Sequence, residues 1–71
     1  MNNNIVQIVL NGEVTNVKQD ATLSELLQML KLQDKRIAIE VNQQVIPRSQ
    51  HISFILSAND HVEIIHAVGG G

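Results

Sequence analysis

Apolar and polar residues alternate over several short segments, which is the period expected of strands that bury one face. Residues 5–10 form a short apolar run that is interrupted only by Gln7. The run ends at Asn11-Gly12, the dipeptide best suited to the positive φ angles of a type I′ turn. The pattern therefore predicts a β-hairpin whose second strand covers residues 13–18.

A helix is predicted after the hairpin, because the apolar period changes there. Thr22 and Glu25 have the spacing of a capping box, in which each side chain accepts a hydrogen bond from an otherwise unpaired amide. The leucines that follow recur at i, i+3, i+4 and i+7, namely Leu23, Leu26, Leu27 and Leu30. We expect a helix from Thr22 to Leu32 with one leucine stripe.

The second half of the chain predicts three more strands. Residues 37–41 alternate as a strand, residues 42–44 form a turn, and Val45-Ile46 pairs back until Pro47, which has no amide hydrogen to donate. A turn at residues 59–60 precedes a last strand over residues 62–68. The order β-β-α-β-β-β predicts an α+β fold, a mixed sheet with the helix packed across one face and the first and last strands side by side in parallel.

Polar residues within the strands indicate which face meets solvent. If Gln7, Glu40 and Glu63 point outward, alternation sends the inward set toward the leucine stripe: Val6, Ile8, Leu10, Ile37, Ile39, Val41, Val62 and Ile64. The outward apolar set is Ile5, Val9, Ala38, Ile65 and Ala67. Two interpretations stay open, a docking surface and scattered surface aliphatics without a role.

The length and composition restrict how the fold is stabilised. The chain has 71 residues, no cysteine and a single aromatic residue, Phe54. Disulfides, thiolate metal sites and thiol nucleophiles are thereby excluded. A single domain with an aliphatic core follows, and such a core supplies only about 3–5 kcal/mol.

Charge and the length of the apolar run argue against nucleic acid and membrane as partners. Five basic and seven acidic residues give a net charge of −2 without a basic run, which is unsuitable for nucleic acid. Residues 1–10 contain no Lys or Arg and too short an apolar run for a signal peptide or a membrane span. We therefore expect a cytoplasmic protein that binds neither nucleic acid nor membrane.

Side chains that could carry chemistry are few. His51, His61 and His66 lack the spacing of a metal site. Ser49 and His51 are close in sequence, but a domain of this size has little room for the rest of a hydrolase site. No phosphate-binding fingerprint is present. We expect no bound metal or cofactor and no enzyme acting alone.

The glycine tail, Gly69–Gly71, is the remaining candidate. We divide the chain into a domain over residues 1–68 and this tail over residues 69–71. A backbone without side chains can thread a narrow tunnel, and three residues span about 10 Å when extended. We expect the carboxylate of Gly71 to be a free end that can be activated, although an incidental glycine end is an alternative.

The element order, together with residues 60–65 running into Ala67-Val68 and the glycine tail, resembles the ubiquitin-like β-grasp sulfur carriers. Two branches are similar, the ThiS carriers of thiamine biosynthesis and the small subunit of molybdopterin synthase. Residues 41–48, which include Asn42, Val45 and Pro47-Arg48, favour ThiS, whose members typically show a comparable Asn-to-Arg segment. The third glycine, Gly69, departs from the usual diglycine and only lengthens the end.

The resemblance implies a mechanism and partners. A ThiF-like adenylating enzyme would use ATP to convert the Gly71 carboxylate into an acyl-adenylate, and a persulfide from a cysteine desulfurase would replace AMP. Thiazole synthase would accept sulfur from the resulting thiocarboxylate. Gly69 and Gly70 would thread the partner's active site. The partner docking face would comprise Ile5, Val9, Ile65 and Ala67.

Three alternatives to this function stay open at this point. The chain could be a carrier of the molybdopterin branch, a modifier that joins its terminal glycine to a lysine of another protein, or an interaction domain with an incidental tail. Only the interaction domain does without the terminal carboxylate.

Overall fold

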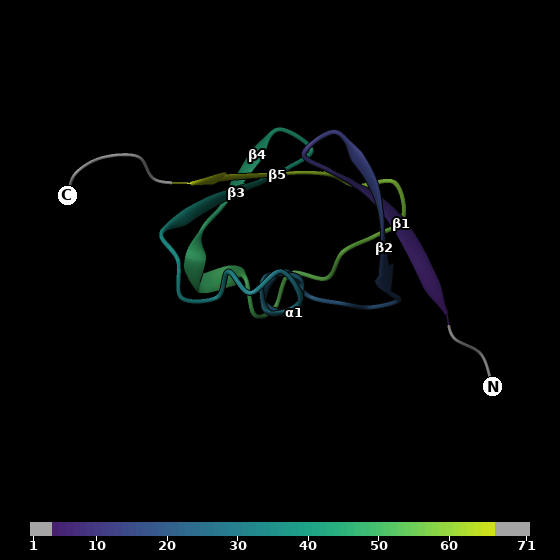
Figure 1. The fold of residues 1–71 in the computed structure, drawn as a ribbon, viewed down its shortest axis with the longest axis horizontal. Helices are drawn as coiled ribbons and strands as arrows, with labels where there is room; N and C mark the ends of the chain where they lie inside the picture. The colour runs from purple at the N-terminus through teal and green to yellow at the C-terminus, as the bar shows by residue number, and fades with distance from the viewer. Residues whose placement is uncertain (1–3, 67–71) are drawn as a thin grey trace.

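In the described part of the chain, five strands form one mixed sheet, and a single α-helix lies across one face of it (Figure 1). The computed structural model describes residues 4–66. The strands are β1 (Ile5–Leu10), β2 (Glu13–Lys18), β3 (Ile37–Val41), β4 (Gln44–Ile46) and β5 (His61–His66). Their spatial order is β2-β1-β5-β3-β4, and only the β1–β5 pair is parallel. The predicted α+β arrangement with one mixed sheet is confirmed.

The parallel pair joins the end of β1 to the beginning of β5. Val9 lies opposite His61 and Leu10 opposite Val62, which confirms that the first and last strands are neighbours. β5 begins one residue before the predicted start, and the predicted residues 67–68 lie outside the described residues. Because β1 stops at Leu10, β5 continues past the β1–β2 turn with β3 as its paired neighbour.

The β1–β2 turn has the predicted type I′ backbone and also binds β5. Asn11 and Gly12 have φ angles of 49° and 86°. The Asn11 amide donates to the Val62 carbonyl at 2.9 Å, and Asn11 Oδ1 accepts from the Ile64 amide at 2.9 Å. The Asn11 side chain therefore supplies β5 with a hydrogen bond that the backbone of β1 cannot supply, because β1 ends at Leu10.

Replacing Asn11 by alanine should lower the free energy of unfolding by about 2 kcal/mol, since a partly buried amide loses its acceptor and a left-handed residue gains a Cβ penalty. Asn11→Gly keeps the backbone freedom but not the acceptor, so it should fall between wild type and Asn11→Ala. Urea unfolding monitored by circular dichroism measures both. An alanine variant as stable as wild type would contradict this role.

The helix α1 (Leu23–Met29) begins as predicted. Thr22 is its N-cap, and its Oγ1 accepts from the Glu25 amide at 3.1 Å. Glu25 Oε1 in turn accepts from the Thr22 amide at 2.9 Å, which completes the capping box. Among residues 4–66 there is no helix with the length and apolar character needed to cross a membrane.

The prediction that the helix continues to Leu32 is wrong. Lys31 adopts a left-handed φ of 61°, and its amide donates to the Gln28 carbonyl at 3.0 Å. The Leu32 amide donates to the Leu27 carbonyl at 2.8 Å, which gives the bond pattern of a Schellman motif. No glycine or proline marks this end, and the turn brings Leu32 against the core.

The core lies between the sheet and α1 and follows the predicted parity. Ile8, Ile39, Val41, Val62 and Ile64 are buried, and the other inward residues, Val6, Leu10 and Ile37, are partly buried against them. The leucine stripe supplies Leu23, Leu26 and Leu27, each at most 5% exposed. The core is aliphatic, as the composition requires.

Residues 48–58 are more ordered than the sequence indicates. They begin with a short 3₁₀ helix, η1 (Arg48–Gln50), and later bury Leu56. The Leu56 amide donates to the Ala21 carbonyl at 2.8 Å, and the Leu23 amide donates to the Phe54 carbonyl at 3.0 Å. Backbone bonds thus fix this segment to the start of α1.

Candidate functional site

The predicted reactive residues, Gly69, Gly70 and Gly71, lie outside the described residues, as does Ala67. His66, at the end of β5, is the last described residue before them. The described part of the site is therefore the surface around this end of β5, and the outer face of the sheet that leads to it.

That outer face exposes apolar side chains, as the parity predicts. Ile65 on β5 is 48% exposed and lies opposite Ala38 on β3. Val9 is half-buried on β1, where it lies opposite Val14 of β2. Ile5 is exposed at the start of β1. The described members of the outward set do reach solvent, and their role in docking stays a prediction.

The strand register separates Ile5 from Ile65. Val9 lies opposite His61, Ile5 stands four residues before Val9, and Ile65 stands four residues after His61. At ~3.3 Å per residue, the two isoleucines are about 26 Å apart along the strands. The outward set is thus a row along the face, and of its described members only Ile65 and Ala38 lie near the end of β5.

An open hollow lies at the same end of the sheet. It is lined by Arg36 directly before β3, by Ile37 and Ala38 at the start of that strand, by Ile65, and by Arg48 at the start of η1. Arg48 Nη2 donates to the Lys35 carbonyl at 3.5 Å, which fixes the arginine loosely to the segment before β3. The hollow combines an apolar floor with two guanidinium groups.

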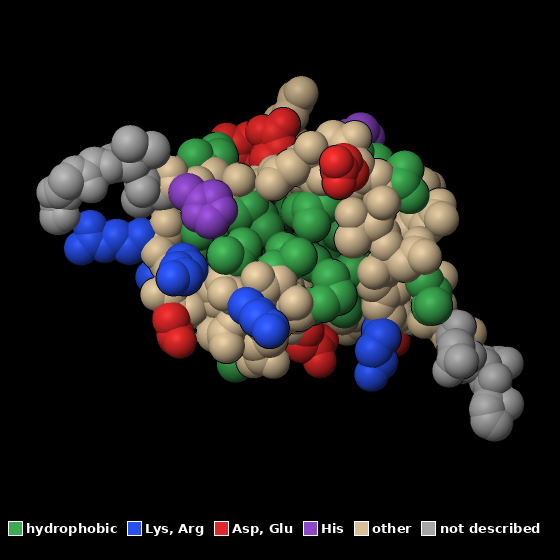
Figure 2. Space-filling model, in the orientation of Figure 1, with side chains coloured by type: hydrophobic (Ala, Val, Ile, Leu, Met, Phe, Trp, Pro, Cys, Tyr) green, Lys and Arg blue, Asp and Glu red, His purple; other side chains and the backbone are tan. Residues whose placement is uncertain are grey.

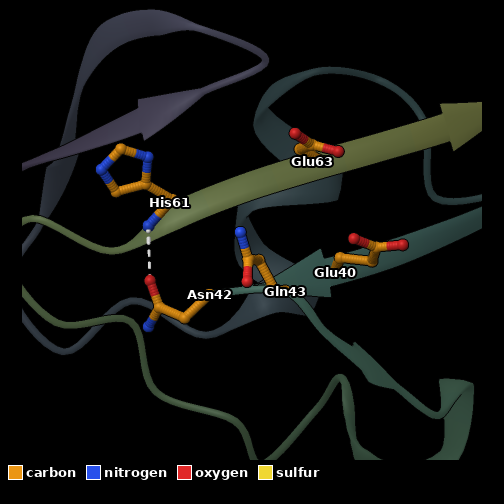
Figure 3. A pocket seen from close by; sticks show the side chains of 5 residues that line it. All are labelled: Glu40, Asn42, Gln43, His61 and Glu63. Carbon is orange, nitrogen blue, oxygen red and sulfur yellow. Dashed lines mark hydrogen bonds between the residues drawn. The ribbon is translucent and has the colours of Figure 1, made fainter.

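A second hollow lies farther from the end of β5 and is acidic (Figure 3). Glu40 on β3 and Glu63 on β5 are directly opposite each other. Figure 3 shows these carboxylates on neighbouring strands, with the His61 ring apart from them. Asn42 binds the start of β5, because its Oδ1 accepts from the His61 amide at 3.0 Å and its Nδ2 donates to Asp60 Oδ1 at 3.1 Å.

The three histidines do not form a common site. His51 is 5% exposed, and its Nε2 lies 3.0 Å from the Ile46 carbonyl, a contact that requires a proton on that nitrogen. His61 and His66 are exposed at opposite ends of β5. Within residues 4–66 no three histidine or carboxylate side chains are grouped so that they could hold a metal ion. His51 therefore has a structural role.

Comparison with known proteins gives a consistent picture. The model of the ThiS family matches residues 2–71. The chain is 35% identical over 63 residues to the sulfur carrier protein ThiS of Bacillus subtilis, a match that covers 87% of this chain and 96% of that protein. It is also 35% identical over 66 residues to a thiazole synthase of Magnetococcus marinus. That match covers 93% of this chain and only 20% of the enzyme.

The fold has a solved counterpart of the same extent. The crystal structure of a thiamine biosynthesis protein (ThiS) from Geobacter metallireducens superposes with a TM-score of 0.81 at 28% identity. The superposition covers 93% of this chain and 100% of that structure. The mixed sheet, the single helix and their order along the chain are thus shared with a solved protein.

Proposed function

The chain belongs to the ThiS family, and we propose from this membership that it carries sulfur for the thiazole of thiamine on the carboxylate of Gly71. The observation that carries the proposal is the match to a named sulfur carrier, which covers 87% of this chain and 96% of that protein. A region like this chain also occurs within a thiazole synthase. The occurrence of a similar region within that enzyme supports thiazole synthase as a partner here.

The chemistry requires that the carboxylate be made electrophilic. A ThiF-like adenylating enzyme would join the Gly71 carboxylate to AMP and release pyrophosphate from ATP. The terminal sulfur of a persulfide, formed by a cysteine desulfurase, would attack the acyl carbon and expel AMP. A thiol would then reduce the acyl disulfide, which leaves the thiocarboxylate on Gly71 and a disulfide on the thiol side.

The chain itself is a carrier in this scheme, and its partners do the catalysis. It contains no cysteine, so a thiol of its own is not available to hold sulfur. Gly69 and Gly70 would thread the partner's active site, where side chains would take up space. ATP belongs to the adenylating enzyme, and we assign the whole sequence of steps to the cytoplasm.

Intact mass spectrometry tests the proposal. The chain is incubated with ATP, cysteine, a cysteine desulfurase and an adenylating enzyme of this family, with Bacillus subtilis ThiS as the positive control. We expect a mass gain equal to the replacement of one oxygen by sulfur, and its loss after addition of thiazole synthase with its other substrates. An unchanged mass, while the control protein gains sulfur, would overturn the proposal.

The docking face can be tested separately with Ile65→Asp. A carboxylate on this half-exposed position should weaken binding to the adenylating enzyme about tenfold, the loss expected from one good interface contact. The thermal midpoint should change little, since a surface substitution usually costs within ~0.5 kcal/mol. Met29→Asp, on α1 at the other face of the sheet, is the control and should bind normally, since Met29 is 52% exposed. A collapsed midpoint for Ile65→Asp would show that Ile65 belongs to the core.

A further inference from the structure

Two arginines from separate parts of the chain line one hollow near the end of β5. Arg36 stands directly before β3, and Arg48 begins η1. The apolar residues that line the same hollow are Ile37, Ala38 and Ile65, and those on its outer side, Ala38 and Ile65, form its apolar floor. Since Ile65 is the residue before His66, this hollow lies beside the point where the chain continues toward the glycine tail.

The charge of the hollow differs from that of the whole chain. The chain has a formal net charge of −2, yet the described residues that line the hollow include two arginines and no aspartate or glutamate. Arg48 donates to the carbonyl of Lys35 at 3.5 Å, and a neutral acceptor does not neutralise its charge. Figure 2 shows lysine and arginine side chains on the side of the molecule where β5 ends, with others spread toward the opposite side. A guanidinium group in this state favours a carboxylate, which it can bind through two hydrogen bonds.

The sign of the charge reverses a short distance along the same face. The Glu40–Glu63 pair stands two residues from the Ala38–Ile65 pair on the same strands, which is about 7 Å. By alternation along β3, the outer face therefore presents the positive charge of Arg36, then the apolar Ala38–Ile65 pair and then the negative Glu40–Glu63 pair. Such an order fixes the orientation of a partner more strongly than its total affinity.

We propose that the hollow between Arg36 and Arg48 binds the adenylating enzyme through an apolar side chain flanked by aspartate or glutamate at the mouth of its active site. The apolar floor accepts the side chain, and each guanidinium group binds a carboxylate. Because the hollow lies beside the end of β5, this contact directs the glycine tail into the enzyme. The inference rests on the proposed function. It specifies the surface that the adenylating enzyme presents to this chain, namely an apolar side chain flanked by carboxylates.

The test compares two double variants with the same change in charge. Arg36→Glu/Arg48→Glu should weaken binding to the adenylating enzyme about tenfold at low salt, as expected for two exposed ion pairs of up to ~1 kcal/mol each. Lys18→Glu/Lys31→Glu changes the net charge equally at positions outside the hollow, and should bind within about twofold of wild type at the same salt, because screening limits distant charges. Isothermal titration calorimetry measures both, after circular dichroism shows that each variant is folded.

Two further measurements keep the outcome decisive. The affinity of Arg36→Gln/Arg48→Gln for the adenylating enzyme should lie between those of wild type and Arg36→Glu/Arg48→Glu. If Arg36→Glu/Arg48→Glu fails to fold, the glutamine variant takes its place in the comparison. In 1 M salt, where the screening length falls to about 3 Å, the difference between the two glutamate variants should largely disappear. Equal binding by both glutamate variants, or by wild type and the glutamine variant, would overturn the inference. If wild type still gains sulfur in that case, the proposed function stands without it.

Discussion

Replacing Gly70 by valine should abolish ATP–pyrophosphate exchange by the adenylating enzyme, while the fold remains intact. Glycine has no Cβ and reaches backbone conformations that valine cannot adopt, and both properties serve a chain that lies extended in a narrow tunnel. The last residue of the described core is Ile64, which lies on β5, six residues before Gly70. The valine should therefore leave the circular dichroism spectrum and thermal midpoint unchanged.

Adding one residue after Gly71 should give the same loss for a different reason. The reactive carboxylate would be moved by about 3.3–3.6 Å, and a misplacement of ~1 Å can already cost about a hundredfold in rate. Gly69→Ala is the milder control, because it places one methyl group farthest from the reacting end. Exchange that persists unchanged in both Gly70→Val and the extended chain would remove the Gly71 carboxylate from the mechanism.

Several features of the fold could be predicted from the sequence because each depends on neighbouring residues. Asn11-Gly12 specifies its turn through backbone φ angles alone, and Thr22 with Glu25 completes a capping box within four residues. Strand parity followed from single polar residues, since alternation transmits one assignment along a whole strand. The buried and exposed residues of β1, β3 and β5 confirm that assignment.

Features that depend on distant residues were not visible in the sequence. The helix ends at a lysine in a left-handed conformation, a position that sequence rules assign to glycine. The bond from Asn11 to Ile64 joins residues 53 positions apart. Parity placed Ile5 and Ile65 on one face, but only the register of β1 on β5 shows that they stand at opposite ends of it.

The candidate site likewise combines a local feature that the sequence shows with a feature that depends on distant residues. The glycine tail is a local motif, and the resemblance to ThiS rests on it together with residues 41–48. Arg36 and Arg48 line one hollow because η1 lies near the start of β3, and residues 48–58 gave no signal for such a helix. Composition indicates an acidic chain, so a local positive hollow could be found only from the structure.

Truncating Ile39 should remove most of the stability of the domain. Ile39 is fully buried on β3, between Ile46 of β4 and Ile64 of β5, in a row that faces α1. Ile39→Ala should lower the free energy of unfolding by about 2–5 kcal/mol, since it leaves a cavity as well as losing apolar contact. A domain of this size has only about 3–5 kcal/mol from its core, so much of the variant should be unfolded at 37 °C.

Two controls separate the core from the outer face. Ile39→Val removes a single methylene group and should cost about 0.5–1.5 kcal/mol, whereas Ile65→Ala on the outer face should stay within ~0.5 kcal/mol. Urea unfolding monitored by circular dichroism gives all three values. Equal losses for Ile39→Ala and Ile65→Ala would contradict the assignment of the two faces.

The same variants show whether the adenylating enzyme binds the folded domain or only the glycine tail. Ile39→Ala should unfold much of the protein but leaves residues 69–71 unchanged in sequence. If the adenylating enzyme recognises the folded outer face, pyrophosphate exchange at low carrier concentration should fall with the folded fraction of Ile39→Ala. Exchange by Ile39→Val should stay near the wild-type rate, since that variant remains mostly folded. Undiminished exchange by unfolded Ile39→Ala would mean that the glycine tail suffices, and the Arg36–Arg48 hollow would then have no part in recognition.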